Sequence, residues 1–290
     1  MVESSVSKTG ALMTGKRGLV MGVANDHSIA WGIARTLAAN GAELAFTYQG
    51  EAQGKRLRPL AESVGSRLVL PCDVGSDAEL EEAFGVLQRQ WGQLDFLVHA
   101  IAFSDRNELK GRYVETSRQN FISTLNISCY SFTDVARRAT AMMKNGGALV
   151  TLTFEGASRV MPNYNVMGVA KAALEASVRY LAADLGKDNI RVNAISAGPM
   201  RTLAGSAVGD ARMVFKWNKA HSPLKKNIEL DHIGGAALYL LSDLSAGVTG
   251  EVHFVDAGYN VVGMPPTADL KGWIAPDNGN GNGNGNVDTD

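Results

Sequence analysis

The chain has 290 residues, 45% of them hydrophobic and 20% charged, which is enough apolar material for one large α/β domain. A net charge of −1 gives no whole-protein attraction for nucleic acid or for an anionic membrane surface. Only Cys72 and Cys129 occur, with no metal-ligand spacing and no apolar run of about 18 residues for a membrane span, so we expect a cytoplasmic protein without a metal.

Strand-like and helix-like segments alternate along almost the whole chain. The alternation predicts a parallel sheet covered by helices on both faces. Right-handed crossovers then favour a single α/β domain with a Rossmann-like, doubly wound sheet of seven strands in the order 3-2-1-4-5-6-7. The predicted strands are 18–23, 43–47, 67–71, 96–102, 148–154, 191–196 and 251–255. The predicted helices are 29–39, 57–63, 77–91, 115–143, 164–185, 210–217 and 230–241.

Both ends of the chain differ in character from this alternating part. Residues 1–14 lack the charged-then-apolar plan of a secretory signal and are expected to form a loose leader. Residues 15–264 are the predicted domain. Residues 265–290 include an Asn/Gly alternation that is too poor in apolar residues to pack, so we expect a disordered tail there.

The first predicted strand runs through a glycine-containing loop into a helix. Gly22 permits a close backbone approach, and Ser28 is placed either to cap the helix or to bond a phosphate oxygen. A helix N-terminus of this kind offers backbone N–H groups and a positive dipole end to a phosphate. A strand–turn–helix that binds nothing has the same pattern, and the usual Gly-x-Gly-x-x-Gly spacing is absent.

Polar residues also follow later strands, and in a doubly wound sheet the ligand lies beyond the carboxyl ends of the strands. Glu51, after the second strand, would repel a ribose 2′-phosphate, which favours NADH over NADPH. Lys55 and Arg56 are near enough to keep NADPH open. Asp73, after the third strand, is placed to accept from an adenine amino group, and Thr202, after the sixth, to bond a phosphate or a carboxamide.

Tyr164-x6-Lys171 is the most informative spacing. Seven helical residues turn about 700°, so the phenol and the ammonium point the same way, about 10 Å apart along the axis. That separation suits two groups that hold different parts of one ligand. A phenol with its ordinary pKa near 10 donates a hydrogen bond to developing negative charge at neutral pH. An ordinary amphipathic helix would show the same spacing, so the pair alone does not decide between the two interpretations.

Together these segments resemble the NADH-dependent enoyl-acyl carrier protein reductases, a divergent branch of the short-chain dehydrogenase/reductase family. The resemblance extends from about Gly15 to Met264. Ordinary members of the wider family carry Tyr-x3-Lys, whereas here the fourth residue after Tyr164 is Gly168. The resemblance is carried by the loop Gly22-x5-Ser28-x-Ala30-x-Gly32, by Cys72-Asp73-Val74, by Phe96 to Ile101, by Tyr164-x6-Lys171, by Ser196 to Ala204 and by Val255 to Tyr259.

The resemblance implies hydride transfer from NADH to the β-carbon of a trans-2-enoyl thioester carried by acyl carrier protein, in fatty acid elongation. It implies that Tyr164 stabilises the enolate oxygen, that Lys171 holds the nicotinamide ribose, and that the chain forms a homotetramer. The implied cofactor-binding residues are Gly22, Ser28, Ile29, Gln49, Asp73, Val74, Ile101, Lys171, Met200, Arg201, Thr202, Leu203 and Ala204. The implied substrate-binding residues are Ser104, Phe154, Tyr164 and Met167.

Two residues depart from the family pattern. Phe154 stands where the common bacterial pattern has a second tyrosine, and Ala102 where many relatives have glycine. We expect activity to persist with an altered substrate or inhibitor preference. The alternatives are a related reductase of another activated substrate and a catalytically weak NAD-binding sensor.

A row of cations follows the predicted cofactor loop. Arg212, Lys216 and Lys219 lie at i, i+4 and i+7, and they are either a docking stripe for the acidic carrier protein or a solvated helix face.

Overall fold

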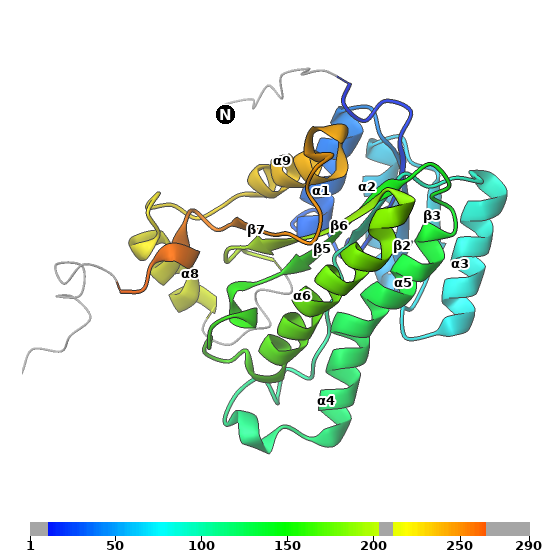
Figure 1. The fold of residues 1–290 in the computed structure, drawn as a ribbon. Coiled ribbons are helices and arrows are strands. Elements are labelled where there is room, and N and C mark those ends of the chain that lie inside the picture. Colours follow the sequence, from blue (N-terminus) through cyan, green and yellow to red (C-terminus); the bar gives the residue numbers. More distant parts are fainter. Residues whose placement is uncertain (1–10, 203–210, 265–290) are drawn as a thin grey trace, which may run out of the picture.

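The computed structural model describes residues 11–202 and 211–264, which fold around one seven-stranded sheet (Figure 1). Every neighbouring pair of strands is parallel, in the order β3-β2-β1-β4-β5-β6-β7. The predicted fold class and strand order are confirmed. The strands are β1 (Arg17–Met21), β2 (Glu43–Tyr48), β3 (Leu68–Pro71), β4 (Phe96–His99), β5 (Gly147–Thr153), β6 (Ile190–Ala197) and β7 (Val252–Val255).

Helices cover both faces of the sheet, and two separate apolar clusters form the core (Figure 1). The central strands are apolar almost without interruption because side chains on both of their faces are buried. One face carries α1 (Ile29–Ala39), α2 (Glu51–Ser63) and α9 (Leu230–Leu241). The other carries α3 (Asp77–Gln90), α5 (Ser131–Thr140) and α6 (Asn165–Leu185). The remaining helices are α4 (Arg118–Leu125) and α8 (Ala211–His221).

Two predicted helices differ from the structure. The expected helix 115–143 is interrupted between α4 and α5 by a π-helical turn, Asn126–Tyr130. The wider turn lets Ser128 Oγ bond the backbone N–H and carbonyl of Phe103, a contact that no hydrophobic period reveals. The helix expected at 57–63 begins six residues earlier, at Glu51. The prediction missed these first turns of α2 because they are polar and carry no apolar periodicity.

The last crossover has the opposite hand to the others. Strands β5, β6 and β7 are displaced in one direction across the sheet, yet α6 and α9, which join them, lie on opposite faces. The connections through α1, α2, α3, α5 and α6 all share one hand, so the expectation of uniformly right-handed crossovers is wrong for α9. Close packing on α1 compensates: a Cβ at Gly32 would lie 2.7 Å from Leu230 Cβ, and one at Gly234 2.1 Å from Thr36 Oγ1.

The packed part of the chain begins before the expected boundary at Gly15. Met13 is completely buried in the core, and its N–H donates to the carbonyl of Asn40. The rest of the expected leader, 1–10, and the expected tail, 265–290, lie outside the described residues. Within the described part of the chain, no helix is long and apolar enough to cross a membrane, and no cluster of three metal-ligating side chains occurs.

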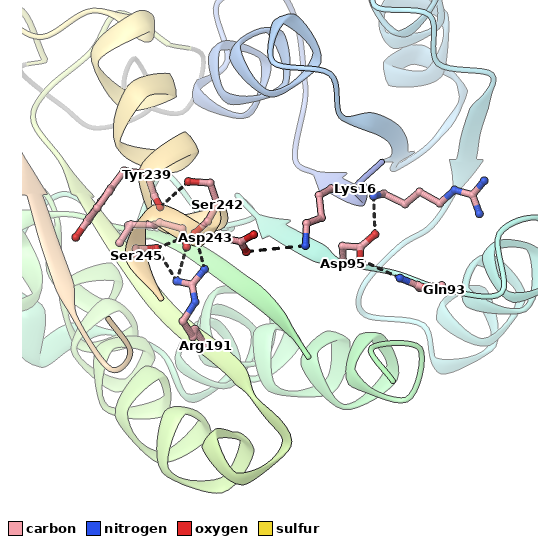
Figure 2. Close-up of polar contacts among 10 residues, drawn as sticks. Lys16, Gln93, Asp95, Arg191, Tyr239, Ser242, Asp243 and Ser245 are labelled. Carbon is pink, nitrogen blue, oxygen red and sulfur yellow. Dashed lines mark hydrogen bonds and ion pairs between the residues drawn. The ribbon is translucent and has the colours of Figure 1, made fainter. Parts of the chain in front are cut away.

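Polar contacts fix the edge of the sheet where the strands begin (Figure 2). At the start of β6, the Arg191 guanidinium donates to the carbonyls of Leu240 (2.7 Å) and Ser242 (3.0 Å) and to Ser245 Oγ (2.7 Å). These acceptors lie at and just beyond the C-terminus of α9, where helical carbonyls lack partners and the dipole is negative. A single side chain therefore ties α9 and the turn that leads to β7 onto the sheet.

The neighbouring contacts in Figure 2 hold the start of β1 to the same edge. Lys16 lies 3.9 Å from Asp243, and the backbone N–H of Arg17 donates to Asp95 at 2.8 Å. Gln93 donates to the other oxygen of the same carboxylate at 3.0 Å. The carboxylates of Asp243 and Asp95 therefore both have partners within the fold.

Replacing Arg191 with methionine is expected to lower the free energy of unfolding by about 2–4 kcal/mol, because several acceptors at the α9 terminus lose a charged donor. Urea denaturation measures the change. The matched control is Arg89→Met, which removes only an exposed pair with Glu82 and should cost less than about 1 kcal/mol. Equal costs for the two variants would contradict the role given to Arg191.

Candidate active site

The loops that follow β1, β4, β5 and β6 converge at the carboxyl edge of the sheet, because all the strands are parallel. At its centre, β1 and β4 are neighbours whose chains continue toward opposite sides of the sheet. Gly22 has φ +100° there, and a Cβ on it would lie 2.1 Å from the carbonyl oxygen of Ala100. Only glycine fits this contact, so the two loops close on each other without side chains between them.

The N-terminus of α1 faces this edge without a side-chain cap. Ser28 Oγ accepts instead from the backbone N–H groups of Ala24 and Asn25, each at 3.0 Å, so the first of the two alternatives for Ser28, a helix cap, is wrong. The first turn, which begins at Ile29, carries no acidic residue. The positive end of the helix dipole therefore stays available to an anion.

The loops after β2 and β3 meet beside the first loop. Gln49 donates to the Asp73 carboxylate at 2.8 Å, and the residue after Asp73 is Val74, which packs at the edge of the core. Gln53, from α2, donates to the carbonyl of Val23 at 2.8 Å and holds the β1 loop. Three of the predicted cofactor-binding loops are thus joined through hydrogen bonds.

Glu51, in the first turn of α2, is paired with a cation. Its carboxylate accepts from Arg58 at 2.6 Å, and this hydrogen bond is the largest cause of the lowered pKa of Glu51. The Arg58 guanidinium also lies over the Tyr48 ring, 5.2 Å from its centroid. The negative charge predicted to disfavour a 2′-phosphate is therefore present but accompanied by a positive one.

Tyr164 is buried immediately before α6, which begins at Asn165. Its flanking residues, Asn163 and Asn165, have φ values of 56° and 34°, so the phenol enters from a tight turn and not from the helix itself. The ring packs on backbone: a Cβ on Gly156 would lie 2.4 Å from Tyr164 Cδ1. The Phe154 ring meets it edge-on, with centroids 5.2 Å apart. Burial, followed by the charge of Glu175, raises the pKa of this phenol well above 10.

Lys171 is buried on α6, and its Nζ donates to the carbonyl of Leu152 at 2.8 Å. Burial lowers the pKa of this amine to about 8, although the nearby Cys129 and Glu175 act to raise it. A fraction of the side chain is therefore neutral at slightly alkaline pH, which is rare for lysine.

His99 lies behind this lysine. Burial, followed by the charge of Lys171, lowers the pKa of His99 to about 3, so its ring is neutral. Its two ring nitrogens lie 3.2 Å from Thr151 Oγ1 and 2.9 Å from Ser131 Oγ. The ring thereby joins the ends of β4 and β5 to the start of α5, close to Lys171.

Three of the four predicted substrate-binding residues lie together. Met167 and Tyr164 belong to the same small apolar cluster, against which Phe154 packs. Ser104 is buried, and its hydroxyl contacts Asn120 Oδ1 (3.3 Å) and the Thr124 hydroxyl (2.9 Å). The Ser104 hydroxyl is thus held by side chains of α4.

Comparison with known proteins gives the same assignment from several directions. A family described as Enoyl-(Acyl carrier protein) reductase matches residues 22–260. Enoyl-[acyl-carrier-protein] reductase [NADH] 2 of Rhizobium meliloti is 62% identical, over 90% of this chain and 97% of that protein. The crystal structure of the Anaplasma phagocytophilum reductase in complex with NAD is 58% identical with a TM-score of 0.85, covering 89% of this chain and 97% of that one. The Bacillus cereus enzyme with NADP+ and indole naphthyridinone is 50% identical with a TM-score of 0.86, covering 87% and 99%.

This chain belongs to the enoyl-acyl carrier protein reductase family. The resemblance read from its motifs is therefore confirmed.

The reductase loop after β6 is described only in part. Met200 packs against the core, Thr202 donates its backbone N–H to the Met200 carbonyl at 3.0 Å, and the Arg201 guanidinium lies 4.8 Å from the centroid of the Phe215 ring. The remaining two residues predicted to bind the cofactor there, Leu203 and Ala204, lie outside the described residues.

Ile101, another predicted cofactor-binding residue, follows β4 and packs against the core, and Ala102, the departure from the family's glycine, is exposed next to it. Glu155, for which the sequence analysis gave no role, is only 6% exposed and follows β5 directly. An acidic residue straight after a buried strand at the carboxyl edge was the signal available for it.

The depressed pKa of Lys171 predicts a definite dependence of stability on pH. The folded value of about 8 lies below the ordinary 10.5, so between these values the unfolded chain binds more protons and folding becomes more favourable as pH rises. From about pH 7.5 to about pH 10, the reductase should gain roughly 1–3 kcal/mol relative to Lys171→Met. Urea unfolding of both proteins measures this, with Lys187→Met, an exposed site, as control. A constant difference between wild type and Lys171→Met would show that Lys171 keeps its ordinary pKa.

Proposed function

We propose that this chain is an NADH-dependent enoyl-acyl carrier protein reductase that saturates the C2–C3 double bond of a trans-2-enoyl thioester during fatty acid elongation. One observation carries the proposal: a buried phenol and a buried amine, Tyr164 and Lys171, follow β5 at the carboxyl edge of the sheet, the edge at which α1 also begins without a side-chain cap. Family membership and the NADH-dependent relatives support the same activity. A cytoplasmic location fits this role.

Residues of this chain fit a nicotinamide dinucleotide. The uncapped start of α1 suits the pyrophosphate, and Gly22 lets the loop before that helix close on the backbone at Ala100. Asp73 suits the adenine amino group, and Lys171 suits the ribose hydroxyls, because an ammonium has three donors and Leu152 takes one of them. When bound, the cofactor supplies the hydride. The negative charge of Glu51 supports NADH over NADPH, and its partner Arg58 is the group that weakens this preference.

Tyr164 acts on the charge that the reaction creates. Reduction at the β-carbon places negative charge on the thioester oxygen, and a donor aimed at that oxygen lowers the barrier most when the charge is largest. Because burial raises its pKa, the phenol keeps its proton throughout the neutral range. Phe154 excludes water from the ring, which strengthens the hydrogen bond further.

The family resemblance also implies a homotetramer, and exposed apolar side chains support it. Ile122 on α4, Tyr130 on the π-turn and Tyr180 on α6 are 57%, 58% and 77% exposed. Residues of this kind that share neighbouring helices are typical of subunit interfaces. Light scattering of the purified protein tests the assembly.

Replacing Tyr164 with phenylalanine is expected to lower kcat by about 100-fold or more, since one preorganised donor to the oxyanion is lost. The dissociation constant for NADH should stay near that of wild type. The control is Tyr180→Phe, which removes an exposed hydroxyl from α6, the helix that Tyr164 precedes, and should leave kcat unchanged. NADH absorbance is followed with crotonyl thioester and with acetoacetyl thioester.

Each outcome of that assay has a separate meaning. Oxidation of NADH with crotonyl thioester alone supports the proposal. Turnover of acetoacetyl thioester alone would identify a reductase of another activated substrate. NADH binding without turnover of either thioester would identify a sensor. This alternative is tested because Phe154 lacks the hydroxyl of the family's second tyrosine. Undiminished kcat in Tyr164→Phe would remove the proposed role of the phenol.

The exposed cations Arg212, Lys216 and Lys219 on α8 support docking of the acidic carrier protein. The double variant Lys216→Glu/Lys219→Glu is expected to raise KM for a carrier-protein thioester by about tenfold at low salt and to leave KM for a coenzyme A thioester unchanged. Steady-state kinetics with both substrates measure this. The control is Lys187→Glu, an exposed lysine just before β6, at the opposite edge of the sheet. Equal effects on both thioesters would show that α8 does not discriminate the carrier.

A further inference from the structure

Two consecutive residues at the end of β5 each bind one charged side chain of α6. The carbonyl of Leu152 accepts from Lys171 Nζ at 2.8 Å, and Thr153 Oγ1 donates to the Glu175 carboxylate at 2.7 Å. Because Lys171 and Glu175 are four residues apart on one helix, they share a face of it, with Cβ atoms about 6 Å apart. A cation and an anion are thus held one helical turn from each other, beside the end of β5.

Arg179 continues this row by one further turn, and the three side chains pass from the interior to the surface. Lys171 is 6% exposed, Glu175 is partly buried and Arg179 is exposed. Burial raises the pKa of Glu175, whereas the hydrogen bond from Thr153 and the charges of Arg179 and Lys171 act to lower it. Three neighbours therefore favour the ionised carboxylate at a position where burial opposes it.

Other elements supply further titratable groups near Lys171. The ring of His99, at the end of β4, is neutral, and Tyr164, in the turn before α6, keeps its proton. Burial lowers the pKa of Lys171, and Cys129, on the π-turn, and Glu175 act to raise it. Among the described residues, Glu175 is thus the carboxylate that offsets part of the cost of burying the Lys171 charge.

The same carboxylate acts on the phenol. After burial, the charge of Glu175 is the second cause of the raised pKa of Tyr164. One negative charge therefore favours the protonated form of both the amine and the phenol. In the proposed reaction both groups act as hydrogen-bond donors, so this is the protonation state in which each can serve.

We propose that Glu175 is a positioning residue of the reductase: its negative charge, held by Thr153, keeps the Lys171 amine protonated and so able to hold the ribose of the cofactor. The inference rests on the proposed function, because the ribose belongs to the dinucleotide proposed to bind there. Glu175 acts through Lys171, and its contribution is therefore visible in the pH dependence of cofactor binding.

The test measures the dissociation constant for NADH by fluorescence between about pH 6 and about pH 10. Wild type is compared with Glu175→Gln, which keeps an acceptor for Thr153 and removes the charge. Wild-type affinity is expected to fall above about pH 8, as Lys171 loses its proton. In the variant the fall should begin about one pH unit lower, because the ammonium has lost its counter-charge. The variant should then bind NADH roughly fivefold more weakly at about pH 8 and almost equally at about pH 6.

Three further variants separate charge from structure. Asp184→Asn removes an exposed negative charge about three and a half turns further along α6 and should leave the curve unchanged. Glu175→Asp keeps the charge and should keep most of the wild-type curve. Glu175→Ala removes the charge by a second route and should reproduce the shift, so a folding fault in one variant does not decide the test.

Two results would overturn the inference. A structural role for Glu175 would weaken NADH binding by the same factor at every pH in Glu175→Gln and Glu175→Ala. A full shift in Cys129→Ser, with none in Glu175→Gln, would assign the effect to the thiol instead.

A second measurement needs neither cofactor nor substrate. Urea unfolding compares Glu175→Gln with Glu175→Gln/Lys171→Met, and wild type with Lys171→Met, over the same range of pH. Without the carboxylate, the stabilisation that Lys171 gives with rising pH should begin about one pH unit lower, because the folded protein releases its proton earlier. The same onset in both pairs would contradict the inference. Wild type that fails to reduce crotonyl thioester removes the proposed function, whereas the unfolding experiment still reports on Glu175 and Lys171.

Discussion

The packing of the Tyr164 ring against the backbone at Gly156 is the contact on which the site depends. A Cβ at Gly156 would overlap the ring, and one at Gly168 would lie 2.7 Å from the Gly156 carbonyl oxygen, so both glycines are needed to bring the turn after β5 onto the start of α6. The phenol is buried by this approach and therefore remains protonated. The same approach holds α6 against β5, which places Lys171 within reach of the Leu152 carbonyl.

The parallel sheet brings other loops to the same edge as this contact, as a site for a cofactor and a substrate requires. Because each strand ends at the same edge, the loop at Gly22, the turn at Glu155 and the segment at Pro199 come together although they are far apart in sequence. The reversed hand of the α9 connection keeps α9 on α1 rather than beside α6, and α8 lies within that connection. Helix α8 is thereby left to cover the ends of β6 and β7, with a small, mostly apolar cavity between them.

The sequence predicted the features that depend on the hydrophobic periodicity of single segments and on the residues that follow each strand. Alternating apolar runs predicted all seven strands and their order. The prediction from the spacing of Tyr164 and Lys171 was wrong in placing both side chains on one helix, because Tyr164 lies in the turn just before α6. Three features escaped because they depend on contacts between distant residues. The π-turn is set by Ser128 bonding to Phe103, the hand of the last crossover by Gly32 and Leu230, and the orientation of Ser28 by its own loop.

The substitution at Phe154 illustrates how chemistry can be conserved while a hydroxyl is lost. A hydroxyl there would bring water or a second donor near the phenol and so divide the hydrogen bonding to the oxyanion. The Phe154 ring instead contacts the phenol edge-on, and the drier surroundings would strengthen the hydrogen bond that we propose Tyr164 donates to the oxyanion. Polarity returns one residue later, at Glu155, which is buried and paired with Arg159 at 3.1 Å. Adjacent positions therefore differ in their contacts: Phe154 packs on the phenol, and Glu155 is held by an ion pair in the turn after β5.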